Sequence, residues 1–327
     1  MRRELERIGR WLLPLALGAF TLYWVYRDFD FGRAFDVLVN RTQWGWVLFS
    51  LLFGISGQVF RGLRWRQALE PLGHTPSRAR CTYAIFASYA ASLIIPRLGE
   101  VSRCGLLQRS DNVPFTASLG TVVTERLVDA ACILVLTAVV FLCNFSFFID
   151  FLTQTGLKIP SWIHLFTTVW FYIVLAFGVG VLLLLYRLRR MLFFYERLKG
   201  MVVHLGQGIG SLRNVKRKGC YWLYTLGIWL SYFLHFYFTF YCFDFTSHLG
   251  MGAAWVMFVG GTFAVLVPTP NGAGPWHFVI ISMLMMYGLS ALDAAAFALI
   301  VHGIQTLLVV LLGVVGLAVL NRRGRQG

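Results

Sequence analysis

The chain has 327 residues, of which 58% are hydrophobic and only 13% are charged. A soluble domain carries about 25% charged residues, so this composition excludes a surface that faces water throughout. The net charge of +15 would suit nucleic-acid binding, but the basic residues lie between long apolar runs. We therefore predict an integral membrane protein whose partners are membrane lipids and not nucleic acid.

The apolar runs, taken in chain order, predict the membrane spans. A spanning helix needs about 20 mainly apolar residues. The candidates are Trp11–Tyr26, Trp44–Phe60, Ala117–Phe141, Trp162–Tyr186, Cys220–Phe243 and Ala294–Leu320. No small-residue cleavage site follows the first of them, so we expect it to be retained as a span. The predicted fold class is an all-α integral membrane protein with about six full spans.

Two further apolar stretches are interrupted by residues that break helices. Cys81–Ile95 runs into a first break, and Met251–Val267 runs into a second break that the apolar piece Trp276–Leu289 follows. Proline removes a backbone donor and glycine frees the backbone, so both can end a helix. The breaking residues are Pro96, Gly99, Pro268, Pro270, Gly272 and Gly274. Irregular backbone at membrane depth is tolerated only inside protein or beside a water-filled cavity.

The distribution of Lys and Arg orients the spans, because cytoplasmic loops carry an excess of them. Basic residues gather before the first span, after the second span, within 187–218 and in the tail. The loops at 144–161 and 244–250 hold almost none, and the loop at 27–41 mixes both signs. We therefore expect a multi-pass protein of the cytoplasmic (cell) membrane with both termini in the cytoplasm.

These orientations agree only if each broken segment enters and leaves on the same side, as a re-entrant hairpin. Both halves then consist of a span, a broken hairpin and a span, and the two halves are inverted. Secondary transporters often have this arrangement, with the site where two broken elements meet. The predicted units are an N-terminal span with an external loop over 1–43, a first repeat over 44–143, a linking span with a basic cytoplasmic stretch over 144–219, and a second repeat over 220–327.

Ionisable side chains concentrate in the first repeat. They are Arg97, Glu100, Arg103, Glu125, Arg126 and Asp129. Glu125 and Asp129 share a helix face and repel each other unless a cation lies between them, which Arg97, Arg103 or a substrate amine could supply. Charges at mid-bilayer cost several kcal/mol unless they are paired or hydrated. Two interpretations stay open: a headgroup cavity whose arginines face phosphate, or a structural ion-pair network that joins the hairpin to the helix.

A second polar group accompanies the second break. It consists of His277 beside the glycines, and His302 and Gln305 on one face of the last span. A helix that begins near Trp276 aims free N–H groups at the cavity, which suits an anion. The alternative is a packing turn with hydrogen-bonded polar residues in the core. No catalytic residue, metal site or cofactor is predicted, because the other histidines lack metal spacing and the cysteines form no CxxC pair.

The order of motifs along the chain carries a family resemblance. The motifs are Arg61-x-x-Arg64-Trp65, Pro96-Arg97-x-Gly99-Glu100-x-x-Arg103, Glu125-Arg126-x-x-Asp129 and Pro268-x-Pro270-x-Gly272-x-Gly274. Together they resemble the lysylphosphatidylglycerol synthase transmembrane family, roughly from Trp44 to Leu320. The resemblance implies a flippase-like region that moves an aminoacylated phospholipid between leaflets. In bifunctional members a separate cytoplasmic domain makes that lipid; here the chain ends at Gly327, so we do not expect synthase activity.

One departure from the family limits what the resemblance implies. Many members carry an acidic residue near the position of His277, whereas this chain has Asn271 and a Pro275-Trp276-His277 run there. A cationic lipid is therefore not carried over as substrate. The expected function is a non-enzymatic, flippase-like transporter that moves or binds a polar phospholipid or glycolipid headgroup, with a lipid-synthesis enzyme as a candidate partner.

Two alternatives to a transporter stay open. One is a membrane enzyme that acts on a lipid phosphate or an isoprenoid carrier, with Glu100, Glu125 and Asp129 as acid and base groups or as metal ligands. The other is a lipid-binding accessory subunit that presents lipid to a separate enzyme.

Overall fold

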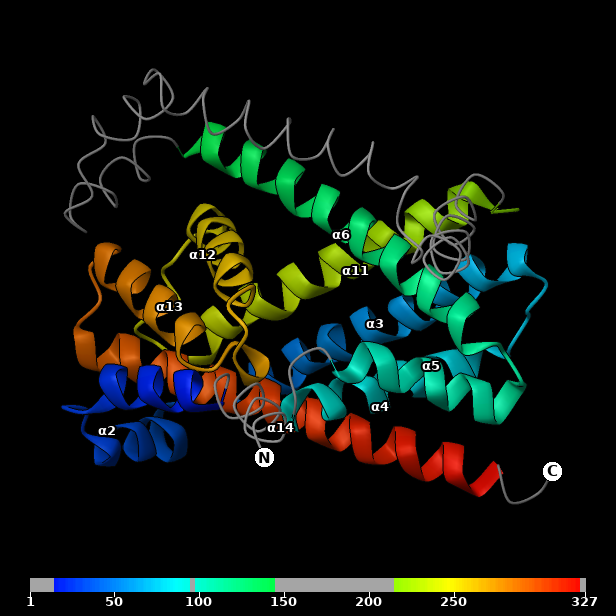
Figure 1. Cartoon of the computed structure of the whole chain (residues 1–327). Coiled ribbons are helices and arrows are strands. Elements are labelled where there is room, and N and C mark those ends of the chain that lie inside the picture. The colour runs from blue at the N-terminus through cyan, green and yellow to red at the C-terminus, as the bar shows by residue number, and fades with distance from the viewer. Residues whose placement is uncertain (1–14, 95–97, 145–214, 324–327) are drawn as a thin grey trace, which may run out of the picture.

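The computed structural model describes residues 15–94, 98–144 and 215–323, and every regular element in these ranges is helical (Figure 1). Pro96, Arg97 and the predicted span Trp162–Tyr186 lie outside the described residues. The helices are Leu15–Tyr26, α2 (Phe31–Asp36), α3 (Trp44–Leu69), α4 (Arg78–Ile94), α5 (Leu98–Asp111), α6 (Phe115–Cys143), α11 (Lys218–Thr239), α12 (Met251–Ala264), α13 (Pro275–Met286) and α14 (Ala291–Arg323). Short turns follow several of them, including η5 (Pro270–Gly272).

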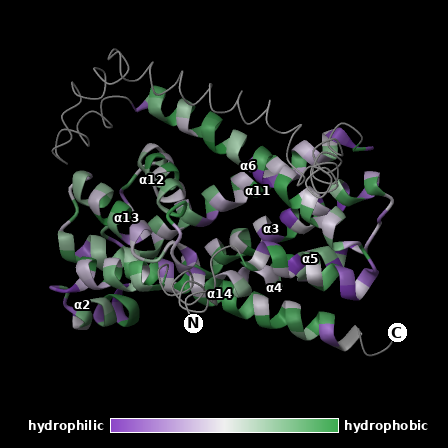
Figure 2. Cartoon of the chain, in the orientation of Figure 1, coloured by the Kyte–Doolittle hydropathy of each residue, from purple (hydrophilic) through white to green (hydrophobic). Residues whose placement is uncertain are grey.

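Long apolar helices with apolar outer faces mark the chain as a membrane protein. Among the described residues, three stretches are long and apolar enough to cross a bilayer: Trp44–Leu72, Phe115–Cys143 and Ala291–Asn321. Leu134 and Val314 on the last two are more than half exposed, and Figure 2 shows hydrophobic residues along most of α6 and α14. A bilayer is the medium that accepts such surfaces. The total of about six spans stays a prediction.

Each interrupted stretch forms two short helices that fold back on one another. At the open end of the first hairpin, Arg80 Nη1 on α4 lies 2.6 Å from Asp111 Oδ1 on α5. Nearer its tip, Gly99 lies in the first turn of α5, where a side chain would collide with the Ser88 carbonyl of α4. In the second hairpin, Gly261 of α12 faces Trp276 of α13. Glycine therefore permits close helix contact in both hairpins.

The break between α12 and α13 is confirmed as irregular backbone. Asn271, Gly272 and Gly274 have φ angles of +52°, +74° and +92°, a region that suits glycine and, among other residues, mainly asparagine. Pro270 begins the short turn η5 and Pro275 begins α13. Because Pro275 lacks an N–H and has a fixed φ, it fits the first turn of a helix.

The two halves, α3–α6 and α11–α14, are interleaved rather than side by side. Both have the order long helix, two short helices, long helix (Figure 1). The long helices α3 and α11 pack along each other, α14 of the second half packs along α4 of the first, and α6 contacts α12. Small residues permit this contact: Gly313 and Gly316 of α14 lie directly against Ala90 and Tyr83 of α4.

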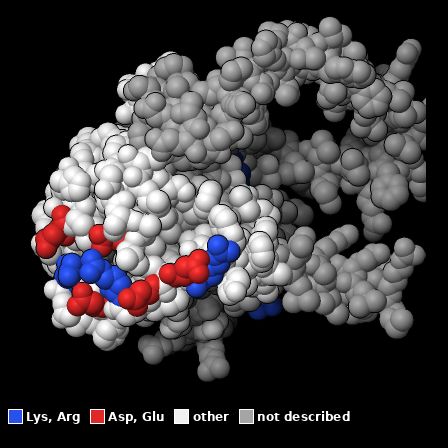
Figure 3. Space-filling model, turned by 90° about the vertical axis from the view of Figure 1, so that its left-hand side faces the viewer, with Lys and Arg blue, Asp and Glu red and all other residues white. Residues whose placement is uncertain are grey.

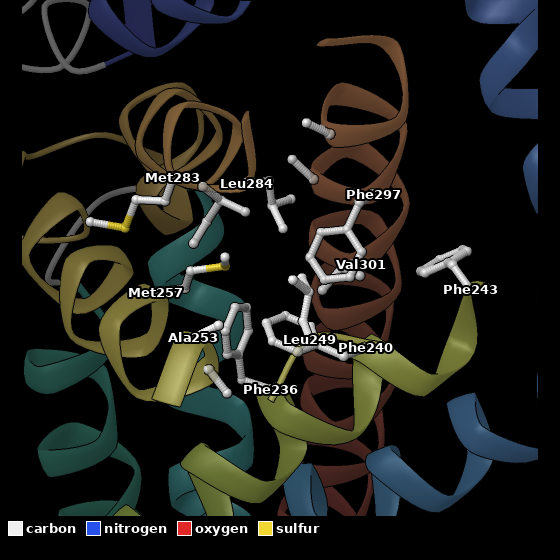
Figure 4. Packing of buried hydrophobic residues seen from close by; sticks show 14 of the residues in the cluster. Phe236, Phe240, Phe243, Leu249, Ala253, Met257, Met283, Leu284, Phe297 and Val301 are labelled. Atoms are coloured by element: carbon white, nitrogen blue, oxygen red, sulfur yellow. The ribbon is translucent and has the colours of Figure 1, made fainter. Parts of the chain in front are cut away.

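The second half has an aromatic and aliphatic core. Phe236 on α11, Phe240 in the short turn η4 (Phe240–Cys242) that follows α11, Met257 on α12, Leu284 on α13 and Phe297 on α14 converge on this core (Figure 4). These side chains pack against one another instead of against lipid, and their packing fixes how the helices approach one another. Among the described residues of the second half, no Asp, Glu, Lys or Arg is buried.

The first helix packs against the second hairpin, a contact that the sequence analysis did not predict. The Tyr26 ring meets the His277 ring edge-on at 5.5 Å, and Trp24 lies 5.8 Å from Phe278. A side chain at Gly274 would collide with Thr21. The division at residue 43 into a separate N-terminal unit stays a prediction, but helix Leu15–Tyr26 is part of the packing around α13.

The two ends of the molecule differ in charge. Both signs occur on the end drawn in Figure 3, where Arg33 pairs with Asp293 and Arg41 pairs with Asp36. Basic residues outnumber acidic ones among the described residues at the opposite end. They are Arg66, Arg78, Arg80, Arg109, Lys216, Arg217 and Lys218, against Glu70 and Asp111.

Candidate functional site

Two arginines of α3 and one carboxylate of α6 form the centre of a buried ion-pair cluster. Arg61 Nη2 lies 2.5 Å from Asp129 Oδ2, and Arg64 Nη2 lies 2.7 Å from Asp129 Oδ1. All three side chains are almost completely buried. Each carboxylate oxygen thus accepts a hydrogen bond from a different arginine, and such charge-assisted bonds are about twice as strong as neutral ones.

The second carboxylate of α6, Glu125, is held from two other directions. Arg103 Nη2 on α5 lies 2.6 Å from Glu125 Oε2, and Arg64 Nε lies 3.6 Å from Glu125 Oε1. The Arg103 guanidinium also lies over the Trp65 ring, 4.5 Å from its centroid. Arg64 therefore contacts both Glu125 and Asp129, and a substrate amine is not needed to separate these two carboxylates.

Arg61 and Arg64 are the members of the cluster that the sequence analysis missed. It ended the second span at Phe60 and assigned both arginines to a basic loop, which is wrong, because α3 continues to Leu69. Their i,i+3 spacing was a usable signal, since it places two cations on one helix face. A hydropathy profile is read along the sequence, so it cannot show that a charged side chain is paired with a residue on another helix.

Arg126 and Glu100 extend the cluster outward. Arg126 Nε lies 2.9 Å from Glu100 Oε1, and these side chains are 43% and 34% exposed. Arg126 Nη1 also lies 3.7 Å from Asp129 Oδ2, so the outer pair is continuous with the buried one. Among the described residues, the cluster consists of Arg61, Arg64, Arg103 and Arg126 with Glu100, Glu125 and Asp129. The arginines in this described set outnumber the carboxylates, so the set carries excess positive charge.

A cavity of about 380 Å³ lies between the two halves and reaches this cluster. Its polar lining includes Gln58, Arg61, Arg126, Asp129, Asn271 and Gln305. Trp229, Phe258 and Leu308 are among the apolar residues of its wall. Residues of both halves thus line one space whose surface is charged in one part and apolar in another.

Tyrosines from both halves hydrogen-bond to Arg61, one of the residues that line the cavity. Arg61 Nη1 donates to the Tyr89 hydroxyl of α4 at 2.9 Å and to the Tyr232 hydroxyl of α11 at 3.2 Å. The two hydroxyls lie 3.3 Å apart. Arg61 is therefore fixed by α4, α6 and α11 together, which orders the charged part of the cavity.

The predicted polar group of the second half divides between the cavity and the packing behind it. Gln305 lines the cavity. His302 Nε2 lies 3.1 Å from the Asn271 carbonyl oxygen, and its ring lies 4.5 Å from that of His277. His277 is buried, and its Nδ1 accepts a hydrogen bond from the Gly274 N–H. The two histidines thus hold the irregular turn that presents Asn271 to the cavity.

The structure therefore separates the predicted site residues into three groups. Arg126, Asp129 and Gln305 line the cavity. Glu100, Arg103 and Glu125 belong to the ion-pair cluster beside it, and His277 and His302 belong to the turn behind it. Arg97 lies outside the described residues. Contact with a substrate stays a prediction for all of them.

Apolar helices around a paired charge cluster define a helical, multi-pass membrane protein. The family called "Lysylphosphatidylglycerol synthase TM region" matches residues 11–313. The chain belongs to this family, as the order of its motifs predicted.

Two curated relatives are similar to parts of the chain. The first, named glycosyltransferase AglD, is from Haloferax volcanii and is 29% identical over 140 residues, which is 42% of this chain and 22% of that protein. The second, the UPF0104 membrane protein MJ1595 of Methanocaldococcus jannaschii, is 26% identical over 159 residues, which is 46% of this chain and 45% of that protein. The chain thus matches less than half the length of either relative. No solved structure matches it.

Proposed function

We propose that the protein is a flippase-like transporter that binds a polar lipid headgroup in the central cavity and carries it across the cytoplasmic membrane. The family name provides the lipid context. A headgroup in this cavity is shielded from the hydrocarbon core, while its acyl chains remain in the surrounding lipid. Shielding matters because a charge in the bilayer centre costs several kcal/mol.

The observation that carries the proposal is the position of Arg126. Its side chain, 43% exposed, is the most exposed among the described arginines of the cluster, and the residue lines the cavity. The buried arginines Arg64 and Arg103 are held by buried carboxylates, whereas Glu100, the carboxylate nearest Arg126, is itself 34% exposed. An anionic headgroup, above all a phosphate, offers Arg126 a bidentate partner and offsets the excess positive charge of the cluster.

The arrangement of the hairpins supports an inverted repeat around this cavity. The second break contributes Asn271 to the lining, and η5 contacts α4 of the first hairpin. The two halves share one order of helices. In inverted-repeat transporters the substrate site lies where two such elements meet. The basic end of the molecule supports a cytoplasmic position for that end, following the bias of Lys and Arg.

A translocation assay tests the function and the site together. The purified protein is reconstituted into vesicles that contain a fluorescent phosphatidylglycerol. A chemical quencher that cannot cross the bilayer then removes the fluorescence of the outer leaflet, and the further decay of fluorescence measures how fast the lipid changes leaflet. We expect faster exchange than in empty vesicles, and a rate for Arg126→Ala close to that of empty vesicles. Arg109→Ala removes an exposed arginine outside the cavity lining and should match the wild type. Equal rates for Arg126→Ala and the wild type would contradict the site.

The carboxylates give less support to a membrane enzyme. Asp129 and Glu125 are both held by arginines, and Glu100 is paired with Arg126. A carboxylate oxygen that already accepts a hydrogen bond from a guanidinium is not free to exchange a proton with a substrate. The glycosyltransferase name of one relative is the observation that favours an enzymatic context. We place glycosyl or aminoacyl transfer, if it accompanies transport, in a separate lipid-synthesis partner.

A further inference from the structure

A second pocket lies at the basic end of the molecule, apart from the central cavity. It has a volume of about 260 Å³ and is formed by the end of α3, the start of α4 and the segment that leads into α11. Arg66, Gln67 and Glu70 come from the first of these, and Lys216 and Arg217 from the last. The central cavity and this pocket share no lining residue among those described.

The lining of this pocket is strongly cationic. Arg66, Arg78, Lys216 and Arg217 face a single carboxylate, Glu70, whose partner is Arg66 at 3.0 Å. None of the ion pairs between described residues involves the other three cations. Several like charges gathered around one hollow repel each other unless an anion occupies it. The pocket is therefore electrostatically suited to a phosphate group.

A buried amide in the wall of this pocket lacks a hydrogen-bond partner. Gln67 is 7% exposed, and its Oε1 atom is buried without a hydrogen bond to any described residue. An unsatisfied buried acceptor costs about 1–3 kcal/mol, so a partner is expected. The amide can donate from its nitrogen to a phosphate oxygen and accept at its oxygen from a neighbouring hydroxyl.

The pocket borders a surface that suits lipid. On α11, Tyr224 lines the pocket. Trp222, Leu223 and Leu226, in the same turns of α11, have exposed fractions of 59%, 64% and 64%. An aromatic and aliphatic surface next to cations is the pattern found where a membrane meets water. A soluble phosphate would use the cations but not this apolar surface.

We propose that this pocket binds the phosphate of an anionic lipid whose headgroup also carries a hydroxyl, at the membrane surface and separately from the central cavity. Lys216, Arg217 and Arg78 neutralise the phosphate. Gln67 bonds both the phosphate and the hydroxyl. The site holds a lipid at one end of the molecule whether or not the central cavity transports it, so this inference does not depend on the proposed function.

The test of this proposal measures lipid binding to the purified full chain that carries Arg126→Gln. This change weakens lipid binding in the central cavity, so that binding to the second pocket can be measured. The probes are short-chain phosphatidylglycerol, short-chain phosphatidylcholine and inorganic phosphate, with affinities measured by native mass spectrometry and by competition. In this background, Arg78→Gln with Lys216→Gln should lower phosphatidylglycerol affinity by about tenfold or more. The matched control, Arg109→Gln with Lys218→Gln, removes two exposed cations from the same end and should change it less than about twofold.

A third variant examines the amide and the nature of the ligand. Gln67→Met keeps the size of the side chain but removes both hydrogen-bonding atoms. It should lower the affinity for phosphatidylglycerol by about threefold to tenfold. The effect of Gln67→Met on the binding of inorganic phosphate should be smaller, because that ion has no hydroxyl separate from the phosphate group to bond Oε1. Equal affinities for the two cation variants would overturn the site. Competition by inorganic phosphate at the same concentration as phosphatidylglycerol would overturn the assignment to lipid.

Discussion

The two halves of the molecule share an order of helices and both have an apolar core, but among the described residues only the first half also buries charged side chains. The first half buries Arg61, Arg64 and Arg103 against two carboxylates. The second half buries phenylalanines, methionines and alanines around Phe240 and Phe297 (Figure 4). One half therefore supplies fixed charge to the central cavity, and the other supplies apolar wall and an irregular turn.

This difference indicates how a lipid headgroup can be held inside a membrane protein. The buried charges of the first half are paired with one another, and Arg126 lies at the edge of the cavity. The apolar half closes the cavity without adding a competing charge. A symmetric arrangement with arginines on both sides would add repulsion and a further desolvation cost.

The largest expected effect is the loss of stability when a buried ion pair is broken, compared with the loss when an ion pair on the surface is broken. Asp129→Asn leaves Arg61 and Arg64 buried without a full counter-charge, so we expect the free energy of unfolding in detergent to fall by about 3–5 kcal/mol. Asp36→Asn removes the half-exposed pair with Arg41, and should cost at most about 1 kcal/mol. Denaturant titration followed by tryptophan fluorescence measures both. Similar losses in the two variants would contradict the view that the charged interior supports the first half.

The next effect concerns lipid affinity at the boundary between the halves. Arg126→Gln removes the exposed guanidinium and should reduce binding of an anionic lipid to the central cavity by about 10- to 100-fold. Arg126→Lys keeps the charge but loses the bidentate geometry, and should be intermediate. Titration of short-chain phosphatidylglycerol checks the order, with the stability of each variant measured in parallel. If Arg126→Lys bound as weakly as Arg126→Gln, charge would not be the source of affinity.

A smaller effect tests how the last helix of the apolar half packs on the charged half. A methyl group at Gly313 of α14 would overlap Ala90 of α4. Gly313→Ala should therefore destabilise the protein by about 1–3 kcal/mol. Gly303 lies on the same helix with open space around its Cα. Gly303→Ala should be neutral or stabilising by about 1 kcal/mol, because alanine favours helix. Thermal unfolding of the two variants distinguishes them.

The smallest expected effect comes from the polar residues of the second half. Gln305 lines the cavity as a neutral group, so Gln305→Leu should weaken lipid binding by only about 0.5–1.5 kcal/mol. The same titration used for Arg126→Gln gives the comparison. A loss as large as that of Arg126→Gln would show that both halves contribute equally to recognition, and the contrast between them would no longer hold.

Hydropathy and helix breakers predicted much of the fold. The helix before the first break and the helices on both sides of the second break occur where the apolar runs lie, whereas α5 follows the first break without an apolar run to indicate it. Asn271, Gly272 and Gly274 adopt the backbone that the glycine-rich turn indicated. The end of α3 was placed too early, because Arg61 looks like the start of a loop until its partner Asp129 is known.

The site was predicted only in part, for the same physical reason. Glu125 and Asp129 required a cation, and their spacing showed this. Arg103, one of the predicted cations, pairs with Glu125. The cations that pair with Asp129, Arg61 and Arg64, depend on how α3 packs against α6, and no local pattern encodes that contact. The packing of Tyr26 on His277 likewise joins segments that are far apart in the sequence.

Photocrosslinking at two adjacent residues of α6 tests the central claim most directly. Ile133 lines the cavity, whereas Leu134 is 65% exposed on the outer face. A benzophenone amino acid at each position, irradiated in vesicles of mixed phosphatidylglycerol and phosphatidylcholine, captures the lipid that is present there. We predict enrichment of phosphatidylglycerol at position 133, lost in an Arg126→Gln background, and the bulk lipid ratio at position 134. The same ratio at both positions, unchanged by Arg126→Gln, would contradict a headgroup site between the halves.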